Sequence, residues 1–380
     1  MLCHRKKMKT ALHNFRLITD GAITPKKAVV IENGKIIDVI PDTQIPQDAE
    51  QVDLNNNYLA PGLIDLQVYG SGGKLLGSIY QEAALEQMED DFLKQGTTGF
   101  LATIGTHSDA FFEKVIIAAK NYHSERKGNF LGLHLEGPFL NPLRKGAHLA
   151  EHMHKATLEK VKRWLELGDG VIKMMTIAPE LQDNEVLSYL NDQGVILSSG
   201  HSNATYQEGK AFLNNPVKAV THLYNAMPPM HHREPGYIPA IFEERPYTSI
   251  VADGVHVDFA MVRLAKRELG DKLFLITDAV TETTEGTYPL HELRGNHYVM
   301  PPHYTLSGSC LTMLKAVQNC VEYVGIDLAE AINMASLYPA QLMGATDKGK
   351  IEKGCVADFI VFDEKYNVKT TVLGGAIKTT

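Results

Sequence analysis

The chain has 380 residues, of which 44% are hydrophobic and 22% charged, an ordinary balance for one large globular domain or two smaller ones. Its formal net charge of −8 and the lack of a long basic run argue against nucleic acid as a partner. No apolar run is long enough to span a bilayer, so no membrane partner is expected. The four cysteines form no CxxC pair, which favours a reduced, cytoplasmic setting.

The two ends of the chain are rich in short β-branched runs. The first ten residues are basic without an apolar stretch, so no secretory signal is expected, and a start of translation at Met1 or at Met8 stays open. Asn33-Gly34 between two apolar runs predicts a β-hairpin. Because neither end is large by itself, we expect residues 1–58 and 349–380 to pair in one small β-sandwich domain.

Between these ends, strand-like and helix-like segments alternate. Eight strands are predicted, at Leu59–Gly70, Thr97–Ile104, Phe130–Pro138, Val171–Pro179, Gly194–Ser202, Ala219–Met227, Thr248–Val257 and Lys272–Ala279. Helices are predicted at Ala83–Gln95, Phe111–Tyr122, Thr157–Leu167, Glu185–Gln193, Thr205–Asn214, Ala260–Leu269, Leu311–Val324 and Leu328–Met334. The alternation predicts an α/β fold, a (β/α)₈ barrel over residues 59–348. The polar stretch at residues 281–305 is expected to be either a lid or a plain β-hairpin.

Polar residues follow several of the predicted strands. His201 and His222 end two neighbouring strands, and Glu136 ends another. In a barrel such positions meet at one face, where ligands and metals bind. One carboxylate with two imidazoles leaves an open position for water, which is typical of a catalytic divalent site. Zinc is the first expectation, with iron, manganese or cobalt open; a salt-bridged strand end is the alternative for Glu136.

Asp278 follows the apolar run LFLIT, at the mouth of the last predicted strand. A carboxylate close to a cation can take a proton from water and return it to a leaving group. A helix N-cap or a direct metal ligand is the alternative for this residue.

Motifs in order along nearly the whole chain resemble the amidohydrolase superfamily and, within it, the N-acetylglucosamine-6-phosphate deacetylase family. They are PGLIDLQVYGSGG at 61–73, LGLHLEGPFLN at 131–141, KGAH at 145–148, GHSNAT at 200–205, THLYNAMP at 221–228, REPG at 233–236, ADGVHVD at 252–258, TDA at 277–279 and TLSGS at 305–309. The resemblance implies a barrel with a small β-sandwich domain, one divalent metal, and release of acetate from an amino-sugar phosphate. It also implies a homodimer or homotetramer.

The resemblance implies a role for each matching position. Glu136, His201 and His222 match the metal ligands, Asp278 the acid/base, and His148 the residue that orients the acetyl carbonyl. Positions around the sugar phosphate are matched by Ala147, Asn225, Ala226, Arg233, His256, Leu306, Ser307, Gly308 and Ser309. In some relatives the arginine serves the neighbouring subunit, which is an option for Arg233.

One departure stands out at the end of the first barrel strand. Many amidohydrolases have His-x-His there, whereas this chain has Gln67 and Tyr69. We therefore expect a single metal, with Gln67 contacting it through water, while Tyr69 has no assigned role. Two alternatives stay open: the same reaction on N-acetylgalactosamine 6-phosphate, and a catalytically silent sugar-phosphate-binding protein.

Overall fold

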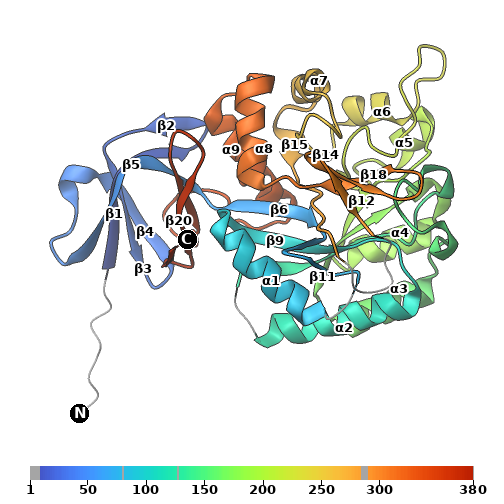
Figure 1. Ribbon diagram of the computed structural model, residues 1–380, viewed down its shortest axis with the longest axis horizontal. Helices are drawn as coiled ribbons and strands as arrows, with labels where there is room; N and C mark the ends of the chain where they lie inside the picture. Colours follow the sequence, from blue (N-terminus) through green and yellow to red (C-terminus); the bar gives the residue numbers. More distant parts are fainter. Residues whose placement is uncertain (1–8, 79–80, 126–127, 284–289, 380) are drawn as a thin grey trace.

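The computed structural model describes residues 9–78, 81–125, 128–283 and 290–379. Met1 and Met8, and with them the question of the translation start, lie outside these residues. The described chain forms an α/β barrel with a smaller β-sheet beside it (Figure 1). Among the described residues, no helix is both long and apolar enough to cross a membrane.

The barrel is an eight-stranded parallel sheet whose strands pair in chain order. An isolated parallel bridge between Val68 and Ala279 joins its two edges. The predicted (β/α)₈ barrel is therefore confirmed. Its strands are β6 (Leu63–Val68), β9 (Thr97–Ile104), β10 (Phe130–Glu136), β11 (Ile172–Ile177), β12 (Ile196–Ser199), β13 (Ala219–Val220), β14 (Tyr247–Ile250) and β15 (Leu273–Leu275).

Several strands in the second half of the barrel are shorter than predicted. The predicted strand at Ala219–Met227, for example, ends already at Val220. The reason is that the chain turns sharply at the polar residues: φ is +48° at His201, +37° at His222 and +52° at Asp278. A non-glycine residue in this left-handed region cannot continue a strand and costs roughly 1–2 kcal/mol. Backbone strain of this kind is common at functional sites, where the unusual conformation sets the direction of the side chain.

The helices cover the outside of the barrel, and each predicted helix has a counterpart. They are α1 (Gln81–Lys94), α2 (Asp109–Glu125), α3 (Leu158–Gly168), α4 (Asn184–Asp192), α5 (Tyr206–Phe212), α6 (Tyr237–Glu244), α7 (Phe259–Leu269), α8 (Met313–Asn319), α9 (Leu328–Ala335) and α10 (Leu337–Leu342). The prediction missed α6 and α10, which contain Pro239 and Pro339. Both prolines lie in the first turn, where the N–H has no helical partner and its loss costs little.

The smaller sheet combines both ends of the chain. Its order is β21-β20-β19-β5-β1-β3-β4, with β2 paired to β1. The bounds are β1 (Lys9–Thr19), β2 (Ala22–Thr24), β3 (Lys27–Glu32), β4 (Lys35–Pro41), β5 (Ala49–Pro61), β19 (Phe359–Phe362), β20 (Val368–Leu373) and β21 (Ala376–Thr379). The strands form one continuous sheet with its own core, which includes Leu12, Val29, Leu59 and Phe359.

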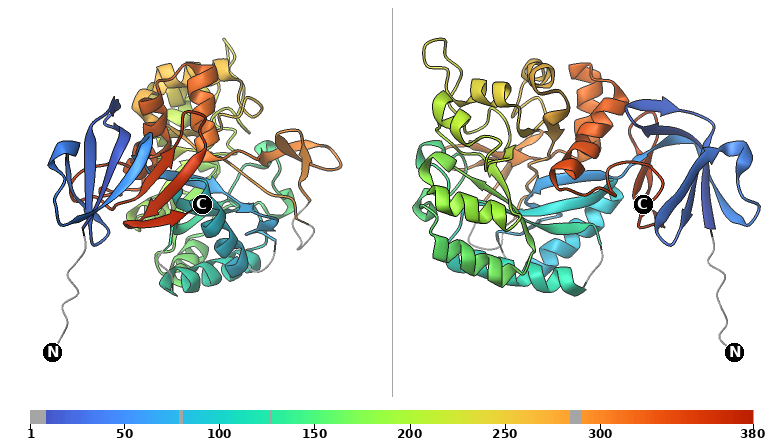
Figure 2. Two further views of the ribbon diagram at one scale, coloured as in Figure 1. Left: turned by 60° about the vertical axis from the view of Figure 1, so that its left-hand side comes forward. Right: turned by 180° about the vertical axis from the view of Figure 1, so that it is seen from behind.

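The hairpin predicted at Asn33-Gly34 is confirmed between β3 and β4, and both turn residues have positive φ, +53° and +76°. The sheet lies beside the barrel and contacts α1 and α9 (Figure 2). Because β5 runs to Pro61 and β6 begins at Leu63, the chain passes from the sheet into the barrel almost without a linker. This sheet therefore joins the barrel at the amino end of β6, away from the carboxyl ends of the barrel strands.

Residues after the last barrel strand form a small antiparallel sheet of β16 (Glu292–Arg294), β17 (His297–Met300) and β18 (Thr305–Ser309). The stretch predicted as a lid or a hairpin is thus a hairpin over β16 and β17, while residues 284–289 lie outside the described chain. Ser309 exchanges backbone hydrogen bonds with Asp278 and Val280, at 2.9 and 3.0 Å. These bonds fix β18 at the mouth of the barrel.

Candidate active site

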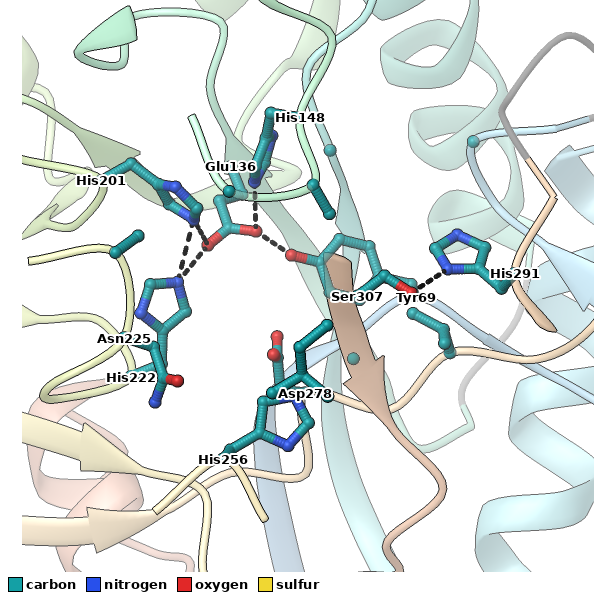
Figure 3. Close-up of a pocket in the computed structure, with 18 of the residues that line it drawn as sticks. Tyr69, Glu136, His148, His201, His222, Asn225, His256, Asp278, His291 and Ser307 are labelled. Carbon is teal, nitrogen blue, oxygen red and sulfur yellow. Dashed lines mark hydrogen bonds and ion pairs between the residues drawn. The ribbon is translucent and has the colours of Figure 1, made fainter. Parts of the chain in front are cut away.

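A cavity of about 230 Å³ opens at the carboxyl ends of the barrel strands. Figure 3 shows side chains from several strands converging on it. The residues predicted from the sequence that line it are Glu136, Ala147, His148, His201, His222, Asn225, Ala226, His256, Asp278, Leu306, Ser307 and Gly308. The barrel therefore gathers into one place residues that lie far apart in the chain, such as Glu136 and Gly308.

Glu136, His201 and His222 present three ligand atoms to one point. Oε1 of Glu136 lies 3.0 Å from Nε2 of His222 and 3.5 Å from Nε2 of His201, and the two nitrogens are 3.1 Å apart. Ligands about 2.0–2.1 Å from a tetrahedral zinc ion are about 3.3 Å from one another. The spacing of the three atoms therefore fits a single divalent cation between them.

The protonation states of Glu136 and His201 also suit a cation at this point. Burial raises the pKa of Glu136, but contacts with the rings of His148, His201 and His222 outweigh burial and hold the pKa well below its usual range. Burial lowers the pKa of His201 to about 4, so this imidazole is neutral. Its Nδ1 lies 2.8 Å from the carbonyl oxygen of Arg144 and must carry the hydrogen, which leaves the Nε2 lone pair free for a cation.

Nε2 of His222 faces the carboxylate of Glu136, so a proton or a cation must lie between the two groups. Burial lowers its pKa, but the hydrogen bond and charge of Glu136 outweigh burial, and the net pKa of His222 is raised. A proton on Nε2 can satisfy the carboxylate of Glu136, and a divalent cation satisfies it and both imidazoles at once.

His148 also lies near, since Glu136, His148 and His201 have ligand atoms within 4.8 Å of one another. Its tautomer, however, differs from that of His201. The backbone N–H of Thr106 donates to Nδ1 of His148 at 3.0 Å, so the hydrogen of the neutral ring must lie on Nε2. That N–H points toward Oε2 of Glu136, 3.3 Å away. His148 thus places an N–H at the edge of the cation position.

Asp278 lies beside this centre, directly after the last barrel strand. Burial raises the pKa of its carboxyl to about 7; the charge of His222 acts against the rise and that of Glu136 adds to it. The side chain accepts a hydrogen bond from Nε2 of Gln67 at 2.8 Å. Gly308 allows β18 to pass over this residue, because a Cβ there would lie 2.9 Å from the Asp278 carbonyl oxygen. A carboxyl group whose pKa lies near 7 can both accept and return a proton at neutral pH.

The other end of the cavity is polar and holds an unpaired nitrogen. Nδ1 of His256 lies 2.6 Å from the carboxylate of Asp253, which holds that ring in place. Burial raises the pKa of Asp253, but the hydrogen bond from His256 outweighs it and lowers the pKa. Nε2 of His256 is buried and has no hydrogen-bond partner in the described part of the chain. Asn225 and Ala226 line the same cavity.

Three predicted residues do not line the cavity. Gln67 lies behind the wall, where its amide contacts Glu136 and Asp278. Ser309 is fully buried, and its hydroxyl donates to the carbonyl oxygen of Thr277 at 2.6 Å. Arg233 is exposed on residues 228–236, a segment that stands out from the barrel before α6 (Figure 1).

Sequence reasoning missed His291, which lines the cavity and lies 3.0 Å from the hydroxyl of Ser307 (Figure 3). Burial lowers the pKa of His291 to about 4, so its ring is neutral. No local motif marks this residue, because it precedes a short strand in a polar stretch. Conversely, His134 of the HLEGP motif is a core histidine that contacts Leu66 and Thr176.

The chain is similar to known proteins over almost its whole length. The model of the amidohydrolase family matches residues 58–378. N-acetylglucosamine-6-phosphate deacetylase of Haemophilus influenzae is 38% identical, over 98% of this chain and all of that protein. The human protein of the same name is 30% identical, over 96% of this chain and 94% of its own length.

Solved structures give the same result. The crystal structure of N-acetylglucosamine-6-phosphate deacetylase from Pasteurella multocida superposes with a TM-score of 0.92 at 33% identity, covering 98% of this chain and 100% of the other. A variant of the Mycobacterium smegmatis enzyme, in complex with N-acetyl-D-glucosamine-6-phosphate, superposes with a TM-score of 0.88 at 25% identity, with the same coverage. The chain belongs to the amidohydrolase family and, within it, to the N-acetylglucosamine-6-phosphate deacetylases.

Proposed function

We propose that this chain hydrolyses the N-acetyl group of N-acetyl-D-glucosamine 6-phosphate, giving D-glucosamine 6-phosphate and acetate in amino-sugar catabolism. One observation carries the proposal: three side chains that can bind a cation, one N–H donor and one carboxyl group whose pKa is raised to about 7 converge on a single cavity. A protein that only binds a sugar phosphate has no need of all these groups together. The relatives that carry this activity by name match the chain over almost its full length.

The residues divide the work of amide hydrolysis as follows. A divalent cation held by Glu136, His201 and His222 would lower the pKa of water toward neutrality. Asp278 accepts the proton of the attacking water and then delivers it to the departing amine nitrogen. The Nε2–H of His148 donates to the carbonyl oxygen as negative charge grows there, an effect typically worth about 3–4 kcal/mol. Zinc is our first choice for the ion, and metal analysis of purified protein decides between it and iron, manganese or cobalt.

The direct test is acetate release from N-acetylglucosamine 6-phosphate, compared with N-acetylgalactosamine 6-phosphate under the same conditions. These sugars differ in the configuration of one hydroxyl group, so the ratio of their kcat/KM values identifies the substrate. Acetate release from neither sugar, combined with tight binding of both, would show a silent binding protein instead.

We assign the phosphate to the end of the cavity that holds His256, Asn225 and Ala226. Because Nδ1 of His256 faces Asp253, Nε2 is the ring atom that meets the phosphate. For His256→Ala we expect kcat/KM on the phosphorylated sugar to fall roughly 10–100-fold, the value of a charged hydrogen bond. The unphosphorylated sugar should lose little, and exposed His231→Ala is the matched control. Equal losses on both sugars would contradict this assignment.

Arg233 is proposed to bind the phosphate in the cavity of a second subunit, since it lies outside its own. Its planar guanidinium suits phosphate oxygens. We expect Arg233→Ala and His222→Ala each to be nearly inactive, and a mixture of the two, exchanged into hybrid oligomers, to recover part of the activity. Light scattering measures whether the chain is the expected dimer or tetramer. Hybrid oligomers without any recovery would place the arginine in its own subunit.

The cytoplasmic location stays a prediction.

A further inference from the structure

Tyr69 is the residue of the site to which the sequence assigned no role, and the structure holds it firmly. It follows β6 directly, and its backbone N–H donates to the carbonyl oxygen of Ala279 at 2.9 Å, across the closing seam of the barrel. Its ring packs against a small buried cluster of Leu75, Val280 and Tyr298. With backbone and ring both held in this way, the hydroxyl points toward Glu136 (Figure 3).

The hydroxyl of Tyr69 donates a hydrogen bond to Oε2 of Glu136. A phenol O–H donates and a carboxylate oxygen accepts, so Tyr69 is the partner that carries the hydrogen. The Nε2–H of His148 approaches the same oxygen at 3.3 Å. Oε1, in contrast, faces the imidazole nitrogens of His201 and His222. The two oxygens of one carboxylate thus have different neighbours: Oε1 faces the imidazole nitrogens at the cation position, and Oε2 accepts from Tyr69 with His148 beside it.

Gln67 adds donors to the same region. Its Nε2 lies 3.0 Å from Oε1 of Glu136, 2.8 Å from Oδ1 of Asp278 and 3.3 Å from the Tyr69 oxygen. The opposite orientation of the amide would turn its oxygen toward two carboxyl groups, so the nitrogen belongs there. In this region the amide of Gln67 and the hydroxyl of Tyr69 direct their hydrogens at the oxygens of Glu136 and Asp278. A cation needs lone pairs, and these hydrogens occupy the lone pairs that the two carboxyl groups would offer a second ion.

We propose that Tyr69 is a positioning residue of the metal centre. Its hydroxyl holds Glu136 as a ligand through Oε1 alone and, together with the amide of Gln67, closes the neighbouring position to a second cation. The centre therefore takes one ion. This inference rests on the proposed function only in requiring that the chain binds a divalent cation.

The test is zinc binding to the metal-free full chain, without substrate, for Tyr69→Phe against the unsubstituted chain. We expect the Kd for zinc to rise roughly 10–100-fold, as for other residues that orient a metal ligand, and kcat to fall more than KM changes. Tyr298→Phe removes a hydroxyl from the same cluster and is the matched control, with an unchanged Kd. An unchanged Kd in Tyr69→Phe would overturn the proposal.

Two further variants separate the hydroxyl from the packing of the ring. Tyr69→Asn restores a donor without the ring, and it should bind zinc more tightly than Tyr69→Phe; the reverse order would show a packing role and overturn the proposal. In the double variant Gln67→His/Tyr69→His, mass spectrometry should find two ions per chain. A single ion per chain would show that Gln67 and Tyr69 are not what keeps the second ion out. If the unsubstituted chain binds no zinc, the proposed metal centre itself fails, and this inference fails with it.

Discussion

Removal of the divalent cation is expected to abolish acetate release. Without a positive charge between Glu136, His201 and His222, water keeps its pKa of about 16 and hydroxide is scarce at neutral pH. Dialysis against a chelator should reduce kcat to the background of the assay, and a stoichiometric divalent ion should restore it. The measurement is kcat together with metal content by mass spectrometry. Full activity in demonstrably metal-free protein would rule out the assigned centre.

Ligand variants show which histidines hold the ion. His201→Ala and His222→Ala should each lose both metal and activity, since each removes one of three ligand atoms. His148→Ala should keep the metal and lose roughly 10²–10³-fold in kcat, the cost of one donor to the developing oxyanion. This contrast follows from the tautomer that the N–H of Thr106 imposes on His148. Loss of metal in His148→Ala, with metal retained in His222→Ala, would reverse the assignment.

Asp278→Asn is expected to lower kcat by roughly 10²–10⁴-fold, the usual contribution of a positioned acid/base. The amide has nearly the same shape but can neither take the proton of water nor return it to the amine. Metal content and substrate binding should stay close to those of the unsubstituted chain, because Asp278 is not among the three ligand atoms. Wild-type turnover in this variant would show that another group moves the proton.

The pH profile tests the same residue independently. Burial raises the pKa of Asp278 to about 7, and the base form is the carboxylate, so activity is lost as pH falls and not as it rises. A neighbouring cation favours the carboxylate, so the acidic limb of kcat/KM is expected at or below about pH 7, with a tenfold loss per pH unit. This limb should be missing from the residual activity of Asp278→Asn. An unchanged limb in that variant would assign it to another group.

The barrel and the types of residue in its site follow from the sequence alone. Apolar runs at strand length, each ended by a polar cluster, predict both the strands and the face to which Glu136, His201, His222 and Asp278 belong. This prediction succeeds because the spacing of apolar residues and the polar residues that end a strand can both be read from a short stretch of sequence. The hairpin at Asn33-Gly34 is predictable for the same reason, since two residues define its turn.

Only the tertiary structure decided how these residues share the work. The tautomer of His148 depends on the backbone N–H of Thr106, which lies 42 positions earlier in the chain. The direction of the Tyr69 hydroxyl depends on the closure of the barrel at Ala279 and on Glu136 across the cavity. The sequence contains every one of these donors and acceptors, but a hydrogen bond is set by distance and angle between atoms. Folding alone determines which of them meet.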